Sequence, residues 1–220
     1  MTLTGVRGLL VDVDGTLLVH DRPIPGSVEA IAALRRAALP FLLLTNTTRR
    51  SRRATAERLQ ATGFDIRPEA IVTPARLARG AGFTFERMNS AFRWLRRGAA
   101  LVALHRNPWW ERSDPEGPVL DAGAYVAALE YATGRTAEVV GKPSPTFFQL
   151  ALAELGLPAE ATLVVGDDLE MDVAAGARVG CGTALVRTGR DRDARVGGPR
   201  PDLVLDSIAD LPERLASSVP

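Results

Sequence analysis

Short apolar runs that end in polar residues alternate with amphipathic helical stretches along this 220-residue chain. Apolar runs of this kind are typical of strands that are buried on both faces of a sheet. Helices between such strands indicate a parallel sheet with helices on both of its faces. We therefore expect an α/β fold with three layers. Strands are predicted at residues 6–11, 41–44, 70–72, 162–165 and 183–186, with a further candidate at 203–205.

The ends of several helices are marked by residues with strong positional preferences. Ser144 and Pro145 are typical of the first two positions of a helix, and Gly156 is typical of a left-handed helix end. Comparable patterns predict helices over residues 51–63 and 169–180.

Residues 75–140 are expected to form a small inserted α/β module, because they lie between two predicted core strands. The core then consists of residues 1–74 and 141–220. Thr84 and Asp121 are predicted N-caps of two helices in the insert, and Gly134 ends the second. Strands are predicted at 100–104 and 136–140, with a long loop over 105–120. The first helix should present one shared face made of Phe85, Met88, Phe92 and Leu95.

The composition excludes several classes of protein. The chain has 27 basic and 26 acidic residues, and this balance gives no indication of a nucleic-acid or membrane partner. Its single cysteine, Cys181, cannot form an internal disulfide, and no Cys/His cluster indicates structural zinc. Aspartates interrupt the first apolar run, and no apolar stretch is long enough to span a bilayer. We expect a cytoplasmic protein.

Polar residues of related chemistry follow the predicted strands. Because the carboxyl ends of parallel strands meet at one edge of a sheet, these side chains should lie close together. Carboxylates, short polar groups and one ammonium group can together hold a divalent cation and a phosphate. The segments concerned are Asp12-Val13-Asp14-Gly15-Thr16, Thr45-Asn46-Thr47-Thr48, Gly141-Lys142 and Gly166-Asp167-Asp168.

Asp12 and Asp14 lie so close in sequence that their charges should repel unless a cation or a shared proton relieves them. Mg²⁺ prefers about six oxygen ligands, and Asp12, the backbone carbonyl of Asp14 and Asp167 could supply part of its shell. Asp12 could then attack phosphorus and form an aspartyl-phosphate. Asp14 is the expected general acid and base, with a pKa nearer neutrality than that of a free carboxyl group.

The remaining polar residues are expected to stabilise the phosphoryl group. Thr45, Asn46, Thr47 and Lys142 are predicted phosphate-binding residues, because hydroxyl, amide and ammonium groups can donate to phosphoryl oxygens. Asp168 and Asp172 are expected to orient Lys142 or metal-bound water from a second layer.

Four motifs in order resemble those of the haloacid dehalogenase superfamily, and the resemblance covers nearly the whole chain. It is closest to subfamily IIA, which includes proteins similar to 4-nitrophenylphosphatase and to phospholysine phosphohistidine inorganic pyrophosphate phosphatase. The resemblance implies a Rossmann-like core, Mg²⁺ dependence and the roles given above to Asp12, Asp14, Asp167 and Lys142. It also implies an α/β cap inserted between the second and third motifs. The motifs are Asp12-Val-Asp14-Gly-Thr, Thr45-Asn46, Gly141-Lys142-Pro143 and Gly166-Asp167-Asp168 with Asp172.

The predicted cap departs from the pattern of the family. Arg79-Gly80 runs almost directly into Gly82-Phe83-Thr84-Phe85, where the family has further strands and a helix. About one βαβ unit is missing from this shortened cap. A sheet edge or apolar face left uncovered in this way could be buried in a homodimer.

The expected function is Mg²⁺-dependent hydrolysis of a small phosphorylated metabolite. A phosphomutase or phosphotransferase with the same core, or a catalytically weak binding or assembly protein with a degenerate cap, are the alternatives. Carbon–halogen hydrolysis would have no use for Asp14, and phosphonate hydrolysis would need a cap lysine that residues 74–140 lack. Two features have no assigned role, the pair Trp109 and Trp110 and the arginines among residues 49–53.

Overall fold

The computed structural model describes residues 3–46, 51–72, 83–110, 119–190 and 199–217. Its centre is a six-stranded parallel sheet with the strand order β12-β11-β10-β1-β4-β5. The α/β fold and its parallel sheet are therefore confirmed. The strands are β1 (Gly8–Asp12), β4 (Phe41–Leu44), β5 (Ile71–Val72), β10 (Thr162–Gly166), β11 (Gly182–Val186) and β12 (Leu203–Leu205).

Alternate residues of the strands pack on opposite faces of the sheet, and this alternation creates two hydrophobic cores. Leu9 and Val11 face a core that also contains Ile31 and Leu34 of α1. Leu10 faces the other core, which contains the buried aromatic rings of α5. Because both faces carry helices, the core has the three layers predicted from sequence. The helices are α1 (Ser27–Arg36), α2 (Arg52–Ala61), α5 (Pro145–Leu155), α6 (Ala175–Arg178) and α7 (Leu211–Ala216).

A short hairpin follows β1. Its strands β2 (Leu18–Val19) and β3 (Arg22–Pro23) are antiparallel. The two residues at its tip, His20 and Asp21, have positive φ angles of 49° and 60°. This is the conformation that the right-handed twist of a two-residue hairpin favours.

The segment after β10 differs from the predicted helix over 169–180. Leu169–Ala174 forms a π-helical turn, and α6 continues from it. Asp168 accepts hydrogen bonds from the backbone amides of Glu170 and Met171, both at 2.9 Å, and so caps this turn. Turns of this wider type are rare and occur often at functional sites.

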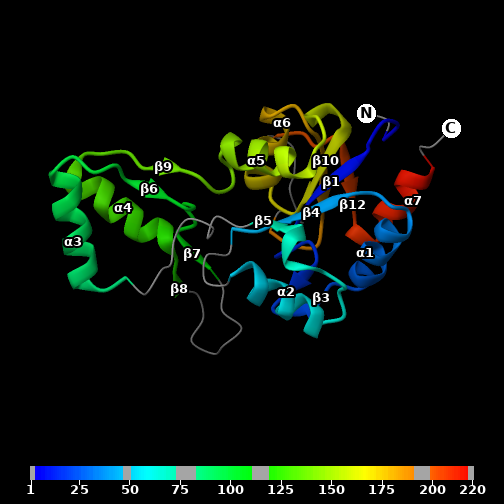
Figure 1. Cartoon of the computed structure of the whole chain (residues 1–220), viewed down its shortest axis with the longest axis horizontal. Coiled ribbons are helices and arrows are strands. Elements are labelled where there is room, and N and C mark those ends of the chain that lie inside the picture. The colour runs from blue at the N-terminus through cyan, green and yellow to red at the C-terminus, as the bar shows by residue number, and fades with distance from the viewer. Residues whose placement is uncertain (1–2, 47–50, 73–82, 111–118, 191–198, 218–220) are drawn as a thin grey trace.

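The elements between β5 and α5 form a second group to one side of the sheet (Figure 1). Thr84 and Asp121 cap helices α3 and α4 as predicted, and Gly134 ends α4 with a φ angle of 67°. A small core of Ala103, Val126 and Ala137 holds the group together. The elements are α3 (Phe85–Arg96), β6 (Val102–Ala103), β7 (Trp109–Trp110), β8 (Val119–Leu120), α4 (Ala122–Thr133) and β9 (Glu138–Val139).

Two details of the prediction for this group were wrong. The expected loop over 105–120 contains the paired strands β7 and β8. Phe85 does not share the buried face of α3, because 77% of its surface is exposed while Leu95 is buried. Phe83 stacks on Tyr125 of α4 instead, with ring centroids 4.1 Å apart. None of the helices in the described ranges combines the length and apolar composition that crossing a bilayer requires.

Candidate active site

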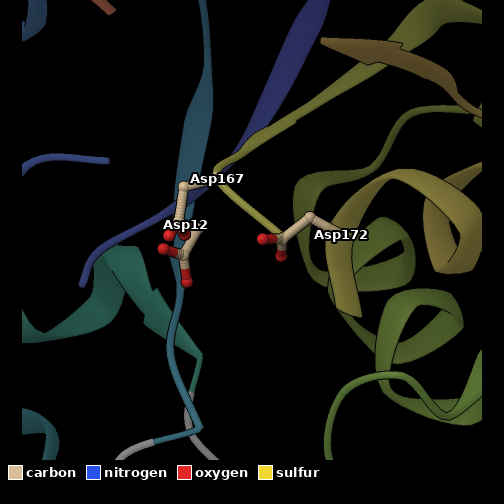
Figure 2. A group of neighbouring side chains, drawn as sticks. All are labelled: Asp12, Asp167 and Asp172. Atoms are coloured by element: carbon tan, nitrogen blue, oxygen red, sulfur yellow. The ribbon is translucent and has the colours of Figure 1, made fainter. Parts of the chain in front are cut away.

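Three buried carboxylates meet at the carboxyl edge of the sheet. Asp12 is the last residue of β1, Asp167 follows β10, and Asp172 lies in the π-helical turn (Figure 2). Because β1 and β10 are neighbouring parallel strands, their ends bring Asp12 and Asp167 together. One oxygen from each of the three carboxylates lies within 4.8 Å of the others.

Lys142 inserts its ammonium group among these carboxylates. Its Nζ lies 2.5 Å from Oδ1 of Asp12 and 2.7 Å from Oδ1 of Asp172. Burial opposes a charge on this lysine, but the adjacent carboxylates of Asp12 and Asp172 raise its pKa above the usual value. Lys142 therefore stays protonated at neutral pH.

One ammonium group does not compensate three carboxylates. Burial, followed by repulsion from Asp172, raises the pKa of Asp167 to about 6. Burial also raises the pKa of Asp12, in spite of Lys142, and that of Asp172. Each shift reflects the cost of holding several anions in a space with little water. The cluster therefore has a deficit of positive charge.

Glycines make room for the carboxylate cluster. A Cβ atom on either Gly15 or Gly189 would overlap the carboxylate of Asp167, and one on Gly166 would overlap that of Asp172. Gly15 also has a φ angle of 95°, which favours glycine over other residues. These positions allow the backbone to approach the carboxylates more closely than any side chain would permit.

Comparison with known proteins shows the family. Residues 9–82 match the family of haloacid dehalogenase-like hydrolases, and residues 139–211 match a second family described as HAD-hydrolase-like. The chain is 33% identical to haloacid dehalogenase-like hydrolase domain-containing protein 2 of Bos taurus, over 94% of this chain and 95% of that protein. The chain belongs to the haloacid dehalogenase-like hydrolases.

Other relatives of this haloacid dehalogenase-like hydrolase have names that state a phosphatase activity. Phospholysine phosphohistidine inorganic pyrophosphate phosphatase of Rattus norvegicus is 33% identical, over 97% of this chain and 95% of that protein. The p-nitrophenyl phosphatase from Archaeoglobus fulgidus superposes with a TM-score of 0.86 at 28% identity, over 94% of this chain and 98% of that one. The 4-nitrophenylphosphatase from Thermotoga maritima superposes with a TM-score of 0.85 at 26% identity, over 96% of this chain and 98% of that one. The chain is a phosphatase of this family.

The cluster fits the divalent cation that phosphatases of the haloacid dehalogenase-like family generally use. Oδ2 of Asp12 is buried and has no hydrogen-bond partner among the described residues. Asp12, Asp167 and Asp172 together carry more negative charge than Lys142 neutralises. Oxygen ligands in such a set suit a hard cation, and a cation would remove the cost that raises the three pKa values.

Asn46 holds the backbone of Lys142 in this haloacid dehalogenase-like site. Its Nδ2 donates to the carbonyl oxygen of Lys142 at 3.0 Å, and its Oδ1 accepts from the amide of Lys142 at 2.9 Å. Thr45 is buried beside it, and its hydroxyl donates to Oδ2 of Asp14 at 3.5 Å. Thr47 lies outside the described residues.

The side chain of Asp14 stands apart from the carboxylate cluster. It is half exposed, and Oδ1 accepts from both Nη atoms of Arg58 at 3.2 Å. Of the two predicted supporting acids, Asp172 contacts Lys142 directly. Asp168 instead caps the π-helical turn and lies 3.3 Å from Nη1 of Arg190.

Sequence reasoning did not find Thr188, Gly189, Arg190 or Arg58. The first three follow β11, so the strand-end argument applied to the other strands could have found them. The Thr188 hydroxyl donates to the carbonyl of Gly15 at 2.6 Å, and the amide of Arg190 donates to Oδ2 of Asp167 at 2.6 Å. Arg58 lies inside α2, where no local signal marks it.

Two features without an assigned role are partly explained. Arg52 pairs with Glu154 and Arg53 with Glu57, so these arginines form a surface face, while Arg49 and Arg50 lie outside the described residues. Trp109 is 53% exposed. His105 is buried, and its Nδ1 accepts from the amide of Asn107 at 3.3 Å.

Proposed function

We propose that this chain hydrolyses small phosphorylated substrates with Mg²⁺ through an aspartyl-phosphate on Asp12. The observation that carries the proposal is the buried set of Asp12, Asp167 and Asp172 around the ammonium group of Lys142. Three carboxylates and one ammonium group leave an excess of negative charge. Such a site suits an anionic substrate that binds together with a divalent metal ion. Asp12, Asp167 and the backbone carbonyl of Asp14 would hold the Mg²⁺.

Asp12 is the proposed nucleophile. Its Oδ1 is held by Lys142, while Oδ2 is buried without a partner among the described residues. A bound Mg²⁺ supplies charge neutralisation, which lets an anionic carboxylate approach a phosphoryl group. Asp12 then displaces the leaving oxygen from phosphorus, and a water molecule later displaces Asp12.

Asp14 is the proposed general acid and base. The end of β1 carries Asp12 into the buried site, and the turn at Gly15 lets the side chain of Asp14 reach the exposed rim. A group at the rim can donate a proton to the departing oxygen and later accept one from the attacking water. The pairing of a buried nucleophile with a rim acid supports this division of roles.

Thr45, Thr47 and Lys142 are the proposed donors to the phosphoryl oxygens. Thr45 directly follows β4, which pairs with β1, so its hydroxyl lies at the same sheet edge as Asp12. Asn46 supports the site by fixing Lys142, and Asp172 orients the ammonium group through its 2.7 Å contact. Together these groups hold the oxygens on which charge develops.

We also propose that residues 1–74 and 141–220 form the catalytic core and that 75–140 form a shortened cap. The alignment with the rat relative runs over 259 positions although this chain has 220 residues, so it includes gaps in this chain. A cap shortened in this way would cover less of the site and leave it more open to substrates of different shapes.

The decisive test is release of 4-nitrophenol from 4-nitrophenyl phosphate by the purified chain. We expect turnover with Mg²⁺, loss of turnover in EDTA and recovery when Mg²⁺ is added back. Asp12→Asn should abolish turnover, while the control Asp65→Asn should not, because Asp65 is an exposed surface aspartate. Wild-type protein that folds but is inactive with every divalent metal tested would contradict the proposal.

The names of the relatives suggest which substrates to test first. One relative is named as a phosphatase of phospholysine, phosphohistidine and inorganic pyrophosphate, and the solved structures are named as phosphatases of 4-nitrophenyl phosphate. We propose that this chain accepts substrates from the same set. A phosphate-release assay over these compounds and a panel of sugar phosphates and nucleotides would rank them by kcat/KM.

A further inference from the structure

Arg58 joins three separate parts of the chain at the rim of the site. It lies in α2, and its side chain is 16% exposed. Its Nε donates to Oδ1 of Asp21 at the tip of the β2–β3 hairpin. Both of its Nη atoms donate to Oδ1 of Asp14 at 3.2 Å. One guanidinium group therefore links α2, the hairpin and the loop after β1.

The planar geometry of the guanidinium group makes this link directional. Arginine presents its donors in a rigid fork, so binding Asp21 through Nε fixes where the two Nη atoms point. The fork takes Oδ1 of Asp14, and Oδ2 lies 3.5 Å from the hydroxyl of the buried Thr45. The two oxygens of Asp14 therefore have different surroundings. Oδ1 contacts Arg58, whereas Oδ2 lies on the side of Thr45, one of the proposed phosphate-binding residues.

We propose that Arg58 is a positioning residue that holds Asp14 with Oδ2 directed at the leaving group. This inference rests on the proposed function of Asp14. In the first step Asp12 bonds to phosphorus, the bond to the leaving oxygen breaks, and Asp14 gives its proton to that oxygen. In the second step water bonds to phosphorus, its proton passes to Asp14, and the bond to Asp12 breaks. Arg58 also stands beside the carboxylate that the first transfer leaves on Asp14.

The test compares two substrates that differ in how much they need a proton donor. Phenolate is a stronger base than 4-nitrophenolate, so phenyl phosphate depends more on protonation of its leaving oxygen. We expect Arg58→Gln to lower kcat/KM about tenfold for phenyl phosphate and only about threefold for 4-nitrophenyl phosphate. Both losses are part of the rate enhancement that general-acid catalysis by Asp14 provides. The measured quantity is the ratio of the two losses.

Two further variants complete the design. Asp21→Asn removes the charge that anchors Nε of Arg58, so it should also reduce kcat/KM more for phenyl phosphate than for 4-nitrophenyl phosphate. This variant keeps the proposal testable if Arg58→Gln folds poorly. Arg53→Gln is the matched control on α2, because Arg53 is 84% exposed and pairs with Glu57. This control should leave both substrates unchanged.

The outcomes separate this inference from the proposed function. Wild-type protein that hydrolyses both esters, with Arg58→Gln reducing both equally or neither, would overturn the role of Arg58 and leave the phosphatase proposal standing. Wild-type protein that hydrolyses neither ester would overturn both. A substrate-dependent loss in Arg58→Gln and Asp21→Asn, without one in Arg53→Gln, supports the positioning role.

Discussion

Asn46 and Lys142 are joined by two hydrogen bonds between the side chain of the first and the backbone of the second, across a sequence separation of 96 residues. Asn46 follows β4, whereas Lys142 lies between β9 and α5. The pair therefore ties the returning chain to the sheet edge. Asn46 was predicted to bind phosphate itself, whereas its observed contacts hold Lys142. These two roles predict different effects when both residues are replaced together.

Asn46→Ala should weaken phosphate binding mainly by releasing Lys142. The variant leaves the amide and carbonyl of Lys142 without these partners, and a lost partner of a buried polar group costs about 1–3 kcal/mol. We expect inhibition by inorganic phosphate to weaken about tenfold, measured as Ki at fixed Mg²⁺. Lys142→Gln should weaken it as well, and the double variant should be little worse than either alone. Fully additive losses would instead indicate that Asn46 and Lys142 act separately.

Asp167 should make the metal-free protein less stable as the pH rises. Its pKa is raised from 3.8 to about 6, so the folded state holds this proton more tightly than the unfolded state. Its contribution to stability is therefore present below pH 3.8 and lost as the pH rises through about 6. In EDTA at pH 8, Asp167→Asn should have a Tm about 5 °C above that of the wild type.

The same variant tests the metal site. At saturating Mg²⁺ the wild-type Tm should rise, because the ion binds the folded state. Asp167→Asn should show no such rise. An unchanged Mg²⁺ response in the variant would argue against Asp167 as a ligand. Equal Tm values for the two proteins in EDTA at pH 8 would instead contradict the destabilising charge assigned to Asp167.

His105 should make stability depend on pH in the opposite direction to Asp167. Burial lowers its pKa from 6.5, although Asp121 acts in the other direction. Protonation at Nδ1 would also remove the hydrogen bond that this atom accepts from Asn107. The fold therefore loses stability as the pH falls below about 6.5, because the unfolded chain binds the proton more readily. His105→Asn should flatten the fall in Tm between pH 7 and pH 5, measured at saturating Mg²⁺. A parallel fall in the variant would show that other groups cause it.

The elements that were predictable from sequence are those that a local pattern specifies. The apolar run that contains β1 ends at Asp12, and the run that contains β10 ends just before Asp167, so the pairing of these strands brought both carboxylates to one edge as expected. Thr84 and Asp121 cap helices because capping depends on adjacent residues. Strand ends and caps are therefore readable before the fold is known.

The contacts that the sequence could not predict depend on tertiary structure. Asp168 and Asp172 are both near Asp167 in sequence, but only the π-helical turn decides that Asp172 meets Lys142 while Asp168 caps the turn. The strands β7 and β8 have two residues each, so they are too short to show a periodic pattern in the sequence. Arg58 pairs with residues 37 and 44 positions away, so no local signal marks it.

Gly189→Ala tests whether the close approach of the backbone to Asp167 is required. A Cβ atom here would overlap the Asp167 carboxylate, while the backbone conformation of Gly189 is one that alanine can adopt. The effect should therefore be steric and local. We expect Mg²⁺ affinity to fall about tenfold, measured by titration calorimetry, with a similar loss of kcat/KM at limiting Mg²⁺.

Gly134→Ala is the matched control for Gly189→Ala, because it separates backbone strain from crowding. Gly134 has a φ angle of 67° at the end of α4, and no atom lies within 4 Å of the position of a Cβ. Its replacement should cost about 1 kcal/mol of stability through backbone conformation and leave Mg²⁺ affinity unchanged. The two alanine variants should thus show opposite profiles, one losing metal affinity and the other losing stability. If Gly189→Ala binds Mg²⁺ as tightly as the wild type does, the ion does not depend on the observed position of the Asp167 carboxylate.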